Sequence, residues 1–165
     1  MDWIDEFSKA WAREYPTADT SSLLLITRLA RLSGLMNAFE RETVAPFDLT
    51  PSDYGVLSAL RRSGSPYELS PSQLYTDLER SSGGMTKVLR RLESLGYVKR
   101  TPDPEDRRSM LVSLTPTGIE VEEQLFNTIL SSAHDLLTPV SRSELKEIDK
   151  SLRSLLETIE KYFYR

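Results

Sequence analysis

Basic side chains gather in one stretch of the sequence, residues 80–108. The stretch contains eight lysine and arginine residues and four aspartate and glutamate residues, whereas the whole chain has a net charge of −4. Lysine binds phosphate as a point charge, and arginine binds it through paired hydrogen bonds. A basic segment in an otherwise acidic chain can bind a polyanion at one place without binding polyanions over its whole surface.

Two adjacent arginines, Arg107 and Arg108, lie in the segment DPEDRRS (103–109), which is rich in turn-forming residues. Short apolar segments with partial period-two alternation flank it, YVKRTP (97–102) and MLVSLT (110–115). This arrangement predicts an antiparallel hairpin with a long charged tip. An acidic residue of the tip can form an ion pair with one of these arginines while the other is exposed to a ligand. The spacing does not decide which of the two arginines is exposed.

Three helices are predicted directly before this hairpin, over residues 50–64, 70–81 and 81–98. The first two begin with an N-cap residue, a proline and a capping-box partner, which are Thr50, Pro51 and Asp53, and then Ser70, Pro71 and Gln73. The third has apolar residues at helical spacing and a glycine at its end. Three short helices followed by a hairpin indicate a winged helix-turn-helix.

A winged helix-turn-helix places its third helix in the major groove of DNA and its hairpin near the minor groove or the backbone. Hydroxyl, ammonium and guanidinium groups contact phosphates or bases there, and backbone N–H groups at a helix start can bind phosphate. The expected DNA contacts are Ser70, Ser72, Gln73, Ser81, Ser82, Gly83, Thr86, Lys87, Arg90, Arg91, Arg107 and Arg108. Taken alone, Arg90 and Arg91 also fit a solvated helix face. The basic hairpin that follows them favours the interpretation that they contact DNA.

Long helical segments are predicted outside this unit, over residues 2–15, 21–42, 116–137 and 141–165. Their apolar residues recur at spacings of three and four, and such faces bind a partner, most economically a second copy. The expected homodimer residues are Leu25, Leu29, Leu32, Ile148, Leu152, Leu155, Ile159 and Tyr162. The predicted fold is mainly α with a small β-hairpin wing. Its winged helix-turn-helix domain (46–117) is embedded in an all-helical dimerisation domain (1–45 and 118–165).

Composition excludes several other classes of protein. Hydrophobic residues make up 39% and charged residues 28% of the 165 residues, as in an ordinary soluble domain. No apolar run approaches the length of a membrane span, and the acidic N-terminus lacks a signal sequence, so we expect a cytoplasmic protein. Cysteine is absent and His134 is the single histidine, which excludes disulfides and multi-histidine metal sites. Without a catalytic set or a phosphate-binding glycine motif, we expect no enzymatic activity, metal or cofactor.

The block SSGGMTKVLRRLESLGYVKRTPDPEDRRSMLVSLTPTG (81–118) resembles the recognition helix and wing of the MarR family of bacterial transcription regulators. The resemblance extends over residues 20–163. It implies a homodimer that binds a pseudo-palindromic operator in double-stranded DNA, usually as a repressor. It also implies that a small phenolic or anionic aromatic effector releases the protein from the DNA. The alternative is a winged-helix protein–protein interaction module without specific DNA binding.

The segment WAREYPTADTSSLLLITRLARL (11–32) resembles a urate-responsive subgroup of this family that has an extra leading helix. In that subgroup a tryptophan on this helix lines the ligand site, which implies that Trp11 binds the effector. The spacing of Trp3, Phe7 and Trp11 by four residues favours a packing role, with the helix docked on the partner subunit, and Trp11 can do both. The positions at which the subgroup has an acidic residue and an arginine fall on Gly55 and Val88. The family's usual pocket further implies lining residues within 25–39 and 50–60.

Overall fold

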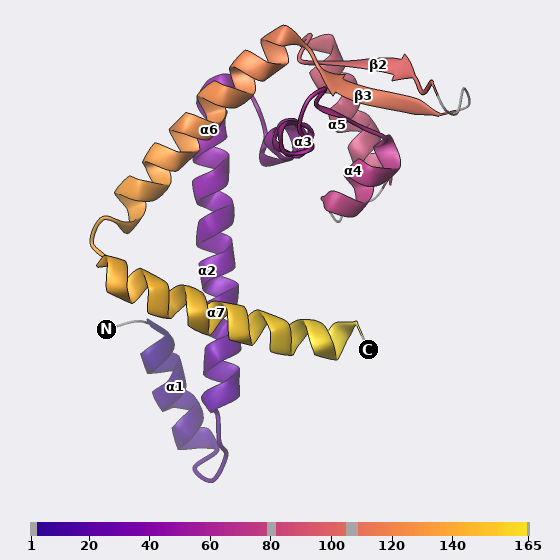
Figure 1. Ribbon diagram of the computed structural model, residues 1–165. Coiled ribbons are helices and arrows are strands. Elements are labelled where there is room, and N and C mark those ends of the chain that lie inside the picture. Colours follow the sequence, from indigo (N-terminus) through magenta and orange to yellow (C-terminus); the bar gives the residue numbers. More distant parts are fainter. Residues whose placement is uncertain (1–2, 79–81, 105–108, 165) are drawn as a thin grey trace. The chain divides into compact units, whose positions relative to one another are not determined.

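The computed structural model describes residues 3–78, 82–104 and 109–164 (Figure 1). Most of these residues are helical, and a small antiparallel sheet completes the fold, so the predicted fold class is confirmed. The elements are α1 (Trp3–Glu14), α2 (Ser21–Val44), the 3-10 helix η1 (Ala45–Phe47), α3 (Pro51–Arg62), β1 (Glu68–Leu69), α4 (Pro71–Asp77), α5 (Ser82–Ser94), β2 (Val98–Pro102), β3 (Met110–Leu114), α6 (Pro116–Leu137) and α7 (Arg142–Phe163).

The predicted capping boxes are confirmed at the start of α3 and α4, and α7 also begins with one. In α3 the Thr50 hydroxyl accepts a hydrogen bond from the Asp53 N–H at 3.2 Å, and Asp53 Oδ2 accepts from the Thr50 N–H at 2.8 Å. Ser70 and Ser141 form the same reciprocal pair with the third residue of their helices. Each box satisfies backbone N–H groups that a helix start would otherwise leave without a partner.

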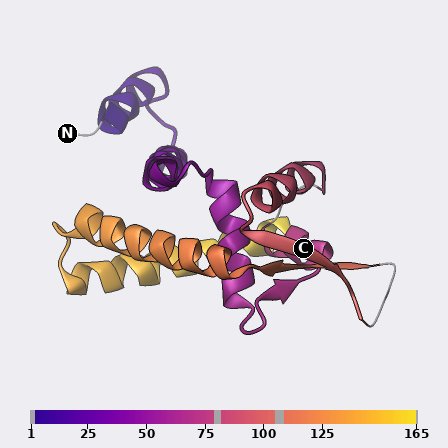
Figure 2. The same ribbon diagram turned by 90° about the horizontal axis from the view of Figure 1, so that it is seen from above.

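The hairpin that follows α5 belongs to a three-stranded sheet with the order β1-β3-β2 (Figure 2). Strands β2 and β3 pair antiparallel from Val98 opposite Leu114 to Pro102 opposite Met110, as predicted. Strand β1 was not predicted, because two residues are too short to show alternation. It pairs Glu68 with Ser113 on the other edge of β3.

The winged-helix core consists of apolar side chains from α3, α4, α5 and the sheet. Figure 1 shows these three helices beside β2 and β3. The core residues exposed by 2% or less are Val56, Leu57, Ala59, Leu60, Leu74, Met85, Leu89, Leu92, Val98 and Val112. From α6, Leu125 is fully buried and the Glu122 carboxylate lies 3.5 Å from Arg61 Nε. The Arg61 guanidinium also lies over the Tyr67 ring, 4.7 Å from its centre. The charged pair therefore links α3 and α6 at the edge of this core.

The chain forms two compact units, residues 1–126 and 127–165, so α6 spans their boundary. In the first unit, α1 packs on α2 through the buried Ile4, and an ion pair of 2.7 Å joins Asp5 to Arg28. The second unit holds the end of α6 and all of α7. Among the described residues, none of the helices combines the length and the apolar character that a membrane span requires.

Candidate nucleic-acid interface

Helix α5 has one buried and one exposed face. Met85, Leu89 and Leu92 recur at spacings of four and three and are 1% exposed or less, because they fill the core against α3. Lys87 and Arg90, at a spacing of three, are exposed on the other side of the helix. Within the described residues, neither Lys87 nor Arg90 forms an ion pair. Their charges are therefore available to a polyanion, as a phosphate-binding face requires.

Arg91 has partners inside the protein, although it was expected to contact DNA. Its Nη2 donates to the backbone carbonyl of Asp48 and lies 3.2 Å from Asp48 Oδ2. Its Nε lies 3.4 Å from Oδ2 of Asp53, which is 1% exposed. The spacing of Arg91 beside Arg90 gave no sign of this difference, because the partners lie on a segment far away in the sequence.

The expected contacts at the start of α4 form a local hydrogen-bond network. Gln73 Oε1 accepts from the Ser70 N–H at 2.8 Å, and the Ser70 and Ser72 hydroxyl oxygens are 2.9 Å apart. The Ser70 hydroxyl oxygen in turn accepts from the Gln73 N–H at 3.3 Å. The Gln73 side-chain oxygen therefore fixes the helix start, and the Ser70 hydroxyl belongs to the same network. A phosphate contact by Ser70, Ser72 or Gln73, whose side-chain amide group is the donor, stays a prediction.

The strands of the wing continue directly from α5. The Tyr97 N–H donates to Leu92 O at 3.0 Å, and Arg100 Nε on β2 lies 3.4 Å from Glu93 Oε2 on α5. At the far end of the hairpin the Asp103 N–H donates to Ser109 O at 3.0 Å. The expected contacts Ser81, Arg107 and Arg108 lie outside the described residues, as do the side chains of Ser82 and Gly83.

Aromatic side chains form a row along α1. Ring centres are 6.1 Å apart for Trp3 and Phe7, 5.9 Å for Phe7 and Trp11, and 5.4 Å for Trp11 and Tyr15. Trp11 was expected to line an effector site. Its position in the middle of this row, half-buried between two other rings, gives it a packing role.

An open hollow of about 330 Å³ lies beside this row, between α1 and α2. It is lined by Trp3, Thr27, Ala30, Arg31, Gly34 and Leu35, and Trp11 is not among these residues. The Arg31 guanidinium lies over the Trp3 ring, 6.0 Å from its centre. The α2 residues fall within the expected range 25–39, whereas no residue from 50–60 takes part. Trp3 and Arg31 were not singled out from the sequence, because the related subgroup offers a matching tryptophan at position 11 only.

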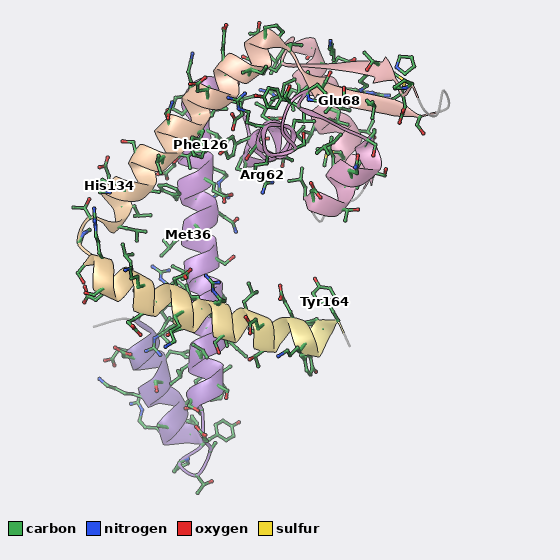
Figure 3. All side chains as sticks on the ribbon, in the orientation of Figure 1. Met36, Arg62, Glu68, Phe126, His134 and Tyr164 are labelled. Carbon is green, nitrogen blue, oxygen red and sulfur yellow. The ribbon has the colours of Figure 1, made fainter. Side chains whose placement is uncertain are left out.

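The expected dimer residues lie on faces that a single chain leaves uncovered. Leu25 and Leu32 on α2 are 45% and 44% exposed, and Leu29 is half-buried. On α7, Leu155 is half-buried. The other four expected residues on this helix are exposed: Ile148, Leu152, Ile159 and Tyr162. Figure 3 labels two further exposed side chains, Met36 on α2 and Tyr164 just after α7.

Comparisons with known proteins agree with this architecture. A sequence model of the MarR family matches residues 47–109. The HTH-type transcriptional regulator PecS of Dickeya dadantii is 31% identical over 159 residues, which are 96% of this chain and 93% of PecS. A cysteine-to-serine variant of MarR from E. coli, solved in complex with operator DNA, is 26% identical with a TM-score of 0.70, covering 84% of this chain and 99% of that chain. Bordetella bronchiseptica BpsR, whose DNA binding is regulated by 6-hydroxynicotinic acid, is 25% identical with a TM-score of 0.67, covering 78% and 90%. The chain therefore belongs to the MarR family of winged-helix transcription regulators.

Proposed function

We propose that this protein represses transcription by binding a pseudo-palindromic operator as a homodimer, with α5 in the major groove. The observation that carries the proposal is the exposed face of α5, where Lys87 and Arg90 stand opposite the buried Met85, Leu89 and Leu92. The operator complex of E. coli MarR, a relative with the same fold, supports it. Thr86 and Ser82 on the same helix, together with Ser81, which precedes it in the sequence, contact bases or phosphates in this proposal.

The homodimer is proposed because the long helices carry apolar faces that the single chain leaves exposed. Leu32 on α2 is 44% exposed, and Ile148 and Leu152 on α7 are 49% and 42% exposed. A stable interface buries about 800 Å² on each partner, and two long helices with exposed apolar side chains are the surfaces on which such an area is expected. Two copies related by a twofold axis would present two α5 helices about 34 Å apart, one turn of DNA.

The wing arginines Arg107 and Arg108 are proposed to reach the minor groove or the backbone next to α5. The strand pairing supports this role, because β2 and β3 keep their register as far as Pro102 opposite Met110. Arginine is favoured in a narrow minor groove, where the negative potential is enhanced.

A small anionic aromatic effector is proposed to lower the affinity for DNA, as 6-hydroxynicotinic acid regulates DNA binding by the relative BpsR. The hollow between α1 and α2 is the candidate site, because Trp3 offers an aromatic surface and Arg31 a cation. An effector that prefers the conformation with low DNA affinity weakens binding by its difference in affinity for the two conformations. Replacing Trp3 by leucine should abolish the response, whereas Trp11→Phe should leave it unchanged.

The experiment that tests the proposed function is binding of the purified protein to the DNA upstream of its own gene, compared with unrelated DNA over a salt series. We expect specific binding that survives salt better than binding to unrelated DNA, with a twofold-symmetric footprint. Transcription from the bound promoter should rise when the protein is removed. Absence of binding to either DNA at low salt, by a protein that is still dimeric, would favour the protein–protein module.

The wing is tested by the double substitution Arg107→Ala and Arg108→Ala. The variant should remain dimeric and lose operator affinity, and its salt dependence should become shallower, because each phosphate contact contributes about 0.9 to the slope. The matched control is Lys146→Ala with Lys150→Ala, which removes the same charge from exposed positions on α7. Equal loss in both variants would show a general charge effect and refute the wing contact.

A further inference from the structure

Arg91 joins the recognition helix α5 to the chain segment that begins α3. Oδ2 of Asp53 accepts from the Thr50 N–H at 2.8 Å and from the Thr50 hydroxyl at 2.7 Å, and it lies 3.4 Å from Arg91 Nε. One buried carboxylate oxygen therefore serves both the N-cap of α3 and the guanidinium from α5. Asp53 is 1% exposed, so an unpaired charge at this position would be costly.

The second anchor of Arg91 is the residue that ends η1. Asp48 has a left-handed backbone conformation (φ 53°), and its N–H donates to Ala45 O at 2.9 Å. Its carbonyl oxygen accepts from Arg91 Nη2. The Asp48 side chain is 94% exposed, so its ion pair with Arg91 contributes little, and the backbone carbonyl and Asp53 are the anchors that matter.

These anchors use two donors on one edge of the guanidinium, Nε and Nη2. Nε faces Asp53 and Nη2 donates to Asp48, so the side-on fork that could bind a phosphate through two hydrogen bonds is engaged inside the protein. Both arginines are exposed, the Arg91 side chain by 42%, and they differ in that Arg90 forms no ion pair among the described residues. Adjacent helix positions point about 100° apart, so Arg91 can reach Asp48 and Asp53 while Arg90 faces a ligand.

We propose that Arg91 is a positioning residue, which fixes the angle of α5 against α3 and η1 and does not itself bind DNA. The proposal rests on the proposed function, since it concerns how the recognition helix is held for operator binding. Because η1 directly follows α2, the same clamp ties the recognition helix to the end of the long helix that carries the expected dimer face.

The sharpest test is Asp53→Asn, because the two roles of Arg91 predict opposite results. Asparagine keeps an acceptor oxygen for the Thr50 cap and removes the charge that holds Arg91. If Arg91 bound phosphate, releasing it and removing a negative charge would leave operator affinity unchanged or raise it. A positioning role predicts a loss on the order of tenfold, comparable with the misplacement of one base contact. Circular dichroism and thermal unfolding establish that the variant is folded, and size-exclusion chromatography establishes that it is dimeric.

A second measurement compares Arg91→Met with Arg90→Met over a salt series. Both substitutions remove one charge and one long side chain from neighbouring positions of α5. Arg90→Met should reduce the slope of log affinity against log salt by about 0.9, the value for one phosphate contact. Arg91→Met should lower the affinity and leave the slope unchanged. Adding Asp53→Asn to Arg91→Met should cause no further loss, because the two residues act as one unit.

The conservative variant Arg91→Lys keeps the charge and covers the case in which Arg91→Met fails to fold. A single ammonium cannot reach both anchors, so we expect an affinity between those of the wild type and Arg91→Met, with an unchanged slope. A slope reduced by about 0.9 in Arg91→Met, or Asp53→Asn protein that binds the operator as tightly as the wild type, would overturn the proposal. Wild-type protein that binds no DNA would instead refute the proposed function.

Discussion

Substitution of Gly118 by alanine should destabilise the protein, although Gly118 lies in a helix. It stands in the first turn of α6, where its N–H donates to the Thr115 hydroxyl at 3.0 Å. Thr115 in turn donates to Gly96 O at 2.6 Å through its hydroxyl, and its N–H donates to Tyr97 O at 3.0 Å. The start of α6 is therefore held tightly against the backbone that leads from α5 into the wing.

The size of the effect follows from the space at Gly118. An added Cβ would overlap the Tyr97 carbonyl oxygen and would lie 2.9 Å from the carbonyl carbon and 3.2 Å from Cα. Carbon atoms make favourable contacts at about 3.5–4.0 Å, and these are backbone atoms that no rotamer change can move. Overpacking of this kind costs about 3 kcal/mol, and the gain in helix propensity from glycine to alanine returns about 1 kcal/mol. We therefore expect a net loss of about 2 kcal/mol.

The assay is urea unfolding at a fixed protein concentration, because a dimer's stability depends on concentration. A loss of about 2 kcal/mol should lower the midpoint by roughly 1 M urea. The matched control is Gly55→Ala in α3, whose Cβ would meet the flexible Leu78 side chain at 3.4 Å, an ordinary contact. This variant should be as stable as the wild type or about 0.5–1 kcal/mol more stable. If Gly118→Ala is stabilising like the control, the close approach of α6 to Tyr97 is wrong.

Two further predictions concern ionisable groups. Burial raises the pKa of the Glu122 carboxyl, and Arg61 opposes this only in part, so the folded state retains the Glu122 proton to higher pH than the unfolded state does. The stability of the wild type relative to Glu122→Gln should therefore fall as pH rises above the ordinary glutamate pKa of 4.5 towards neutrality. Urea unfolding of both proteins at several pH values measures this. A difference in unfolding free energy that does not change with pH would contradict it. Ser141→Ala removes the α7 cap and should cost about 1 kcal/mol at neutral pH. Hydrogen bonds from Ser141 lower the Glu144 pKa, so this cost should shrink in acid as Glu144 becomes protonated, and unfolding of α7 followed by circular dichroism at both pH values checks it.

Local sequence signals determined the secondary structure and the fold class. The N-caps at Thr50, Ser70 and Ser141 lie three residues from their partners, so a capping box is readable without knowledge of the fold. The hairpin strands could also be predicted from local sequence, because turn-forming residues separate two segments of alternating apolar and polar residues. Two adjacent residues, Glu68 and Leu69, carry no such periodicity, and β1 forms because β3 offers them an edge.

The roles of individual side chains were decided by tertiary structure. The sequence placed Arg90 and Arg91 together as basic residues of one helix, and only the fold brings Asp48, 43 residues away, to Arg91. In the same way, the packing of α1 on α2 places Trp3 and not Trp11 beside Arg31. Charge and periodicity are properties of a segment and can be read from the sequence. The partner of a charged or aromatic side chain depends on which distant segment packs against it, and that is fixed by burial of the core.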